Sequence, residues 1–151
     1  MRTFANLQEL KASVGETFGP TEWRTVTQDQ VNLFADATDD HQWIHVDVDK
    51  AKASPFGGTI AHGYLSLSLL PSFLGELVEV KSIAMAVNFG LNKVRFPKPI
   101  PVGSRVRATA ELADVKGSPA GQLTTLKVSI EVEGERRPAC TAEVLFLYVP
   151  E

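Results

Sequence analysis

The sequence predicts an α+β domain in which an antiparallel sheet is covered by one apolar helix. Residues 64–77 carry apolar side chains on nearly every side of a helix, which is typical of a helix buried all round. From residue 83 to residue 148, apolar and polar residues alternate in several runs separated by turn residues, as in strands with one buried face. Because the sheet face and the helix both have to be removed from water, we expect them to pack on each other.

Length and composition indicate a single domain that spans residues 1–151. The 151 residues are 44% hydrophobic and 22% charged, which is typical of a globular domain with a substantial core. The net charge of −3 provides no basic field for a nucleic acid. The lone cysteine, Cys140, excludes an internal disulfide, fits a reducing compartment and is expected to be a buried small side chain.

The first half of the chain predicts short helices around a polar loop. Thr27 begins a capping-box pattern ahead of a helical periodicity, which predicts a helix that ends near Thr38. Residues 39–47 show no usable period, so we expect a loop there. Asp47 can cap a second short helix that runs through Ala53.

The apolar helix over residues 64–77 contains a proline. Pro71 has no amide hydrogen and clashes with the preceding turn at a cost of about 3 kcal/mol, so we expect a kink or a restart. Residues 63–77 are too short and too interrupted to span a bilayer, and residues 1–15 lack the apolar core of a secretory signal. We therefore expect a cytoplasmic protein.

The strands follow from alternating polarity. They are expected at residues 18–26, 83–96, 105–112, 126–133 and 139–148. Within the second of these, apolar residues occupy odd positions over 83–91 and even positions from Val94 onward, so the apolar face slips. A bulge near Asn92 and Lys93 explains the slip.

All three histidines of the chain lie close to aspartates in one short stretch. They are His41, His45 and His62, with Asp39, Asp40 and Asp47. A histidine and a carboxylate in a partly buried loop suit proton transfer near neutral pH; the alternative is a purely structural charged loop. The spacing of His41 and His45 would suit a metal on a helix, but the surrounding residues look like a loop and nothing completes a ligand set, so we expect no metal.

Two motifs in this region resemble a known family. Residues 34–47, Phe-Ala-Asp-Ala-Thr-Asp-Asp-His-Gln-Trp-Ile-His-Val-Asp, are followed by residues 56–63, Phe-Gly-Gly-Thr-Ile-Ala-His-Gly. Both resemble the signature of the MaoC-like, R-specific enoyl-CoA hydratases of the hot-dog fold, and residues 90–103 resemble the later strand and turn of that family. The resemblance covers about two thirds of the chain, and residues 88–106 look especially like mycobacterial single-domain members. It implies a sheet wrapped around a long central helix.

The resemblance also implies a reaction and its residues. Asp40 and His45 fall on the catalytic pair of the family, which holds one water and adds it to a trans-2-enoyl thioester to give the (R)-3-hydroxyacyl product. Gly63 falls on the backbone amide that stabilises the enolate oxygen. No cofactor is expected, because coenzyme A or the pantetheine of an acyl carrier protein is part of the substrate.

Five further residues are candidates for substrate binding. His62 is expected to orient the loop before the helix, and Trp43 either walls the acyl pocket or packs as a core aromatic. Lys93 and Arg95 either meet the phosphates of coenzyme A or face solvent, and Asn92 reaches the site only if the bulge turns it inward.

The chain departs from the family pattern at two places. Asp39 stands where the family has glycine, and Gln42-Trp43 stands where it has Asn-Pro. Aspartate tolerates unusual backbone angles better than most residues, so we expect the loop to survive the first change.

Two other functions and an assembly state accompany the hydratase hypothesis. A hot-dog thioesterase would need an acid on the central helix, where the only acid is Glu76, far along the chain from Gly63. A non-catalytic acyl-binding subunit would have no use for Asp40 and His45. The resemblance implies a homodimer with the two sheets joined and the acyl pocket near the interface.

Overall fold

A curved antiparallel sheet forms the larger layer of the computed structural model, which describes residues 1–151. In spatial order its strands are β2 (Thr17–Phe18), β6 (Arg105–Ser118), β7 (Gly121–Val132), β8 (Cys140–Pro150) and β5 (Ile83–Arg95), and β3 (Arg24–Thr25) also pairs with β6. All of these pairs are antiparallel, as predicted.

The predicted alternation is confirmed in the three central strands. Over residues 106–112 of β6, 124–132 of β7 and 140–148 of β8, even positions are buried and odd positions are at least partly exposed. Cys140 is one of these buried residues, at 1% exposure. The core therefore lies on a single face of the sheet.

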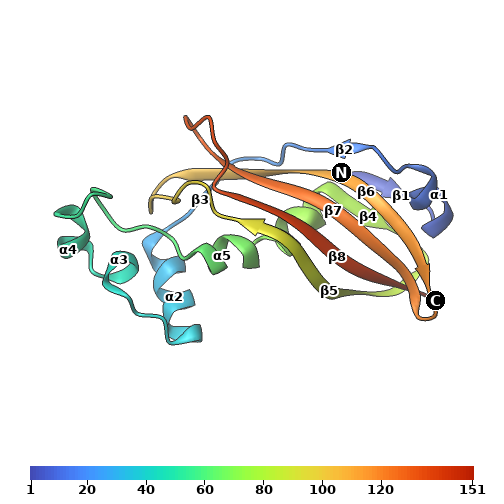
Figure 1. Cartoon of the computed structure of the whole chain (residues 1–151), viewed down its shortest axis with the longest axis horizontal. Helices are drawn as coiled ribbons and strands as arrows, with labels where there is room; N and C mark the ends of the chain where they lie inside the picture. Colours follow the sequence, from blue (N-terminus) through green and yellow to red (C-terminus); the bar gives the residue numbers. More distant parts are fainter.

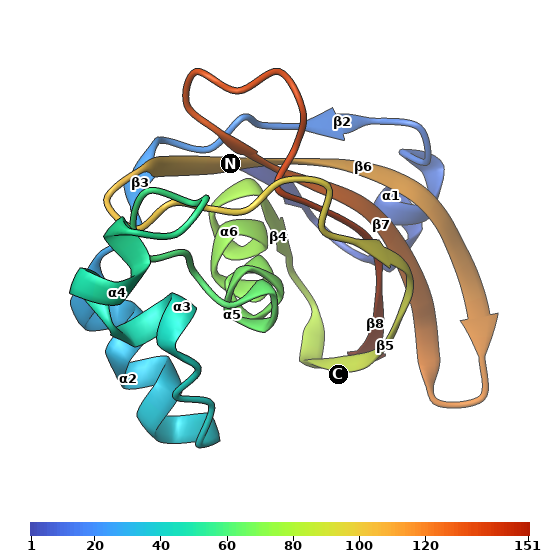
Figure 2. The same cartoon turned by 60° about the vertical axis from the view of Figure 1, so that its left-hand side comes forward.

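The apolar helix lies against the concave face of the sheet in two pieces (Figure 2). α5 (Gly63–Ser68) and α6 (Leu70–Leu77) meet at Leu69, and Pro71 lies in the first turn of α6, so the predicted restart is confirmed. The prediction of burial all round is wrong, because Tyr64 is 72% exposed and Ser68, Ser72 and Glu76 are exposed at the same four-residue spacing. α5 and α6 therefore share a side that this chain leaves uncovered.

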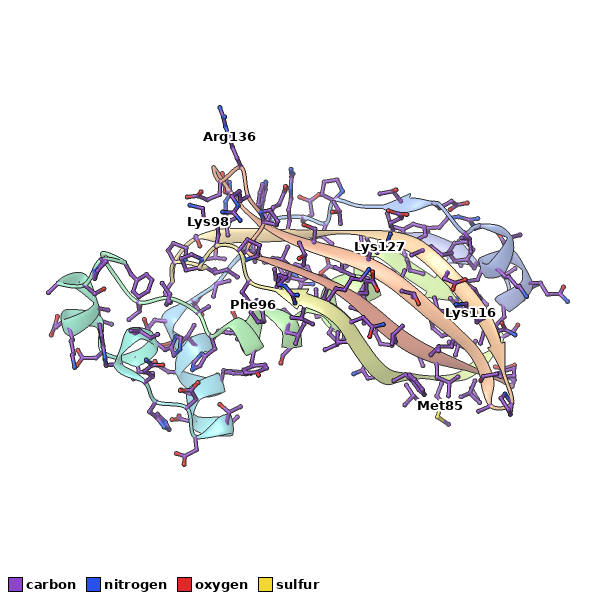
Figure 3. The ribbon with its side chains drawn as sticks, viewed as in Figure 1. Met85, Phe96, Lys98, Lys116, Lys127 and Arg136 are labelled. Atoms are coloured by element: carbon purple, nitrogen blue, oxygen red, sulfur yellow. The ribbon has the colours of Figure 1, made fainter.

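Strand β5 lies at the edge of the sheet and differs most from the prediction. The register shift between Asn92 and Arg95 confirms the predicted bulge, and two further shifts lie earlier in the strand. Its apolar residues are not covered by the helix: Met85, Val87, Phe89 and Leu91 are all exposed. Met85 points away from the body of the protein in Figure 3.

The N-terminal segment contains more structure than predicted. β1 (Arg2–Phe4) pairs in parallel with β4 (Val78–Val80), and α1 (Leu7–Ala12) follows β1. The strand predicted at residues 18–26 is split into β2 and β3. Gly19 has φ 102° and Pro20 has no amide hydrogen, so neither continues the ladder on β6.

Three helices form an arm at one end of the sheet (Figure 1). α2 (Gln28–Thr38) is capped by the Thr27 hydroxyl and α4 (Val48–Lys52) by the Asp47 carboxylate, as predicted. The region predicted as a loop contains one further helical turn, α3 (Trp43–Val46). No helix of the structure combines the length and the apolar character that crossing a bilayer requires.

Candidate active site

Asp40 is positioned by the end of helix α2. Asp39 adopts the left-handed conformation, with φ 58° and ψ 30°, and its amide donates to the carbonyl of Ala35. The expectation that aspartate tolerates unusual backbone angles at this position is therefore confirmed. The amide of Asp40 also donates to Ala35, at 3.2 Å, and the Asp40 carboxylate accepts from the amide of Gln42 at 3.4 Å. The reversal of the chain at Asp39 thus fixes the loop that carries Asp40.

His45 lies on the short helix α3 and is buried at 7% exposure. Its Nδ1 lies 2.7 Å from the carbonyl oxygen of Ile60, which assigns the ring proton of the neutral form to Nδ1 and leaves Nε2 as an acceptor. Burial lowers the pKa of His45, and nearby His62 adds to this, while the Ile60 hydrogen bond and Asp40 act in the opposite direction. His45 is therefore held as neutral imidazole.

His62 contacts both candidate catalytic residues. It is 2% exposed, and its Nε2 donates to the backbone carbonyl of Asp40 at 3.0 Å. Its ring stacks on that of His45, with 3.9 Å between the ring centroids and 23° between the planes, and Phe34 packs on it at 4.9 Å. The buried Nδ1 of His62 has no hydrogen-bond partner within the chain.

The polar atoms of these three side chains converge. One oxygen of Asp40 and one ring nitrogen each of His45 and His62 lie within 4.8 Å of one another. The stacked rings hold the two imidazoles in nearly parallel planes, and each ring already uses one nitrogen in a hydrogen bond to a backbone carbonyl. Each ring therefore keeps one nitrogen for a further in-plane contact with a bound water or ion.

A cavity of about 350 Å³ opens beside His45 and His62. Its lining residues come from α3, from the segment before α5, from α5 itself, from the chain that follows β5 and from the residue before β8. They are His45, Ile60, Ala61, His62, Gly63, Ser66, Phe96, Lys98, Pro99, Ile100 and Ala139.

Gly63 brings a backbone amide to the cavity wall. It is the first residue of α5, and such an amide has no acceptor within the helix. A Cβ at this position would lie 3.4 Å from three ring carbons of Phe96, so the aromatic ring packs flat over the glycine. The hydroxyl of Ser66 donates to the Gly63 carbonyl at 2.6 Å.

Four of the residues suggested for substrate binding lie outside this cavity. The ring of Trp43 packs under the Lys50 ammonium at 4.7 Å. Asn92 is paired with Glu143, on the face of the sheet away from the core, and Lys93 forms a 3.4 Å ion pair with the same glutamate. Arg95 is exposed on the same strand and donates to the carbonyl of Val94.

Sequence reasoning did not single out Phe96 or Lys98, although both line the cavity. The only sequence signal for the lysine was its place between Pro97 and Pro99, at the end of a predicted strand.

The remaining charged residues of the motif point away from the cavity. The Nε2 of His41 forms a 2.8 Å hydrogen bond with the Asp36 carboxylate, and this bond is the main reason why the pKa of His41 is raised. The Asp39 carboxylate lies 3.5 Å from Nδ1 of the same ring. The Asp39 side chain is 99% exposed. Glu76, the acid that a thioesterase would need, pairs with Arg24 and does not line the cavity.

The comparison with known families agrees with the motifs. Residues 9–136 match the model of the MaoC-like domain. The chain is 53% identical over 150 residues to 3-hydroxyacyl-thioester dehydratase Z of Mycobacterium tuberculosis, and the match covers 99% of both chains. It is 29% identical over 112 residues to the (R)-specific enoyl-CoA hydratase of Rhodospirillum rubrum, covering 74% of each.

The fold has solved counterparts. The structure of a protein described as a monoamine oxidase regulatory protein from Archaeoglobus fulgius superposes with a TM-score of 0.79 at 25% identity, covering 99% of this chain and 98% of that one. The predicted hot-dog architecture, a sheet around a central helix, is therefore confirmed.

Proposed function

Because the chain belongs to the MaoC-like domain family, we propose that it is a hydro-lyase that interconverts trans-2-enoyl thioesters and (R)-3-hydroxyacyl thioesters. The observation that carries this proposal is the convergence of the Asp40 carboxylate, which is exposed and does not itself line the cavity, with the rings of His45 and His62, which do. The names of the mycobacterial dehydratase and of the Rhodospirillum rubrum hydratase describe the two directions of this one reaction.

The geometry supports a mechanism in which one water supplies both added groups. The water is held by the Asp40 carboxylate and the free Nε2 of His45. As its oxygen bonds to C3, Nε2 takes its proton, and the imidazolium then returns that proton to C2 on the same face. The carboxylate stabilises the transient positive charge, so the overall change is the addition of one water.

The thioester oxygen becomes negative while C3 is attacked. The Gly63 amide is the proposed donor to this enolate oxygen, because it opens a helix and has no acceptor of its own within it. The Phe96 ring over Gly63 keeps this part of the wall apolar, which strengthens a hydrogen bond to a developing charge.

We also infer that the enzyme is a homodimer that binds acyl-CoA or an acyl carrier protein. The exposed apolar edge strand β5 supports the dimer, and its chain continues into Phe96 and Lys98 of the cavity wall. The acyl pocket would then lie next to the joined edges.

The direct test is hydration of crotonyl-CoA, followed as loss of the absorbance of the conjugated thioester. We expect activity in the parent and a fall in kcat of about a hundredfold or more in both Asp40→Asn and His45→Gln, because each removes acid/base help. Chiral analysis of the 3-hydroxybutyrate obtained by hydrolysing the thioester product should give the (R) enantiomer.

Matched controls come from the same region of the chain. His41→Gln and Asp49→Asn make the same chemical changes at exposed positions outside the cavity, and we expect parental rates. Parental rates in Asp40→Asn and His45→Gln as well would rule out the proposed function.

A further inference from the structure

The cavity beside His45 contains one side chain with a full positive charge. Lys98 is the only lysine or arginine among the lining residues, whose other members are histidine, glycine, serine or apolar residues. The chain contains 15 lysines and arginines, and of these only Lys98 lines the cavity. A fixed cation in the wall of a substrate cavity favours an anionic group on the substrate.

The backbone around Lys98 is stiff. Pro97 and Pro99 flank it, and each proline fixes its own φ while the residue before a proline is restricted to extended conformations. The lysine is half-buried, so its stem is packed and its ammonium remains accessible. The position of its backbone is therefore set by the fold rather than by a mobile loop.

The ion pair of Lys98 within the chain is weak. Glu135 lies 3.8 Å from the ammonium, and both side chains are more than two-fifths exposed. Pairs of this kind contribute little free energy and are easily exchanged for another anion. Lys93, in contrast, lies on the far face of the sheet against Glu143.

Two more cations lie on the turn that carries Glu135. The turn between β7 and β8 carries Arg136 and Arg137, which are exposed and form no ion pair, and the same turn leads directly into Ala139 of the cavity wall. Figure 3 shows Lys98 and Arg136 at the same end of the molecule, with Arg136 projecting outward. The turn that reaches Lys98 through Glu135 thus also carries two unpaired arginines.

We propose that Lys98 binds the phosphate of the phosphopantetheine arm that carries the acyl group, an assignment that rests on the proposed function. This phosphate is shared by coenzyme A and by acyl carrier proteins, so the same lysine serves either carrier. It lies at the far end of the arm from the thioester, so one cavity wall that contains Lys98 as well as His45 and Gly63 offers a cation to the arm and the proposed catalytic groups to the thioester. Lysine is a common phosphate ligand in proteins.

The test compares substrates that differ only in the phosphate. Lys98→Met keeps the apolar stem and removes the charge, and we expect KM to rise about fivefold for crotonyl-CoA and for crotonyl-phosphopantetheine, with kcat unchanged. For crotonyl-pantetheine, which has no phosphate, the variant and the parent should have the same KM. Lys98→Arg should restore the parental values.

A matched control lies on the outer face of the sheet. Lys127 is exposed, forms no ion pair and lies away from Lys98 in Figure 3, so Lys127→Met should leave KM unchanged for every substrate. A crotonyl group on an acyl carrier protein has the phosphate without the nucleotide, and Lys98→Met should raise KM for it as well. An equal rise with crotonyl-pantetheine, or a rise with crotonyl-CoA alone, would overturn the assignment.

Equilibrium binding separates this proposal from the proposed function. Calorimetric titration with coenzyme A, phosphopantetheine and pantetheine requires no turnover, and Lys98→Met should weaken only the first two. If the parent fails to hydrate crotonyl-CoA but shows this pattern, the reaction is wrong and the phosphate site stands. If Lys98→Met binds all three ligands as the parent does, the phosphate site is wrong whatever the reaction.

Discussion

His62 links the two candidate catalytic residues, in addition to lining the cavity and orienting the loop before the helix. It donates to the carbonyl of Asp40 and stacks on the ring of His45 from a fully buried position. It also directly precedes Gly63, the proposed donor to the enolate oxygen. One side chain therefore fixes the spacing between the carboxylate, the imidazole and the start of α5.

The pH dependence of the reaction follows from the environment of His45. Burial and the neighbouring His62 lower the pKa of His45, so its unprotonated form persists to more acidic pH than an ordinary histidine, whose pKa is about 6.5. Hydration needs the free Nε2, so kcat/KM should be lost as pH falls, with a midpoint below that value. A profile of kcat/KM for crotonyl-CoA from acid to neutral pH measures this midpoint.

Substitution of His62 tests the same linkage. His62→Phe keeps an aromatic ring against His45 but removes the second imidazole and the donor to Asp40. We expect the acid midpoint to move to higher pH, because a contribution that lowers the pKa of His45 is gone. We expect kcat to fall about tenfold, as for loss of one net hydrogen bond. A role limited to packing would leave the midpoint in place.

At the scale of elements, the end of α2 sets the position of the catalytic loop. Asp39 holds a left-handed conformation that costs most side chains about 1 kcal/mol or more, and its own side chain is almost fully exposed. Asp39→Gly should leave the free energy of unfolding within about 1 kcal/mol of the parent, whereas Asp39→Val should lower it by about 1–3 kcal/mol. Urea denaturation measures both, and equal stability of the two variants would contradict the expectation.

Sequence reasoning predicted the elements that have one face on the core of this chain and the other face in solvent. β6, β7 and β8 alternate because one face lies on the core, and Pro71 marked the restart of the helix. β5 alternates in the same way, yet its apolar residues are exposed, because periodicity shows only that two faces differ and not what covers them. α3, β1 and β4 were missed because three or four residues are too few to show a period.

The candidate site likewise contains residues that the sequence predicted and residues that it did not. Asp40 and His45 lie in one short segment, so the motif was enough to bring them together. Phe96 and Lys98 reach the cavity from the far end of β5, through contacts between residues distant in sequence that no local pattern encodes. None of the four other suggested substrate ligands lines the cavity, so their roles remain predictions; they are Trp43, Asn92, Lys93 and Arg95.

At the scale of the whole molecule, β5 is an open edge. Its thirteen residues pair with β8 on one side only, and four of its apolar side chains are exposed. Long, apolar and unpaired edges favour pairing with another strand, and a second copy of the same chain offers a matching edge about a two-fold axis. The partner would lie beside Phe96, so assembly and the cavity are coupled through this strand.

The homodimer can be tested by charging that edge. Phe89 is 63% exposed on β5, and Phe89→Lys places a cation where two edges would meet, so we expect a monomer by light scattering while the parent has twice the mass of one chain. Activity should fall with it, since the cavity wall continues from this strand. Leu33→Lys makes the same kind of change at a 69% exposed position on α2 and should remain a dimer. A parent that is monomeric at tens of micromolar and fully active would show that the edge needs no partner, and β5 would then have to be protected by its bulges alone.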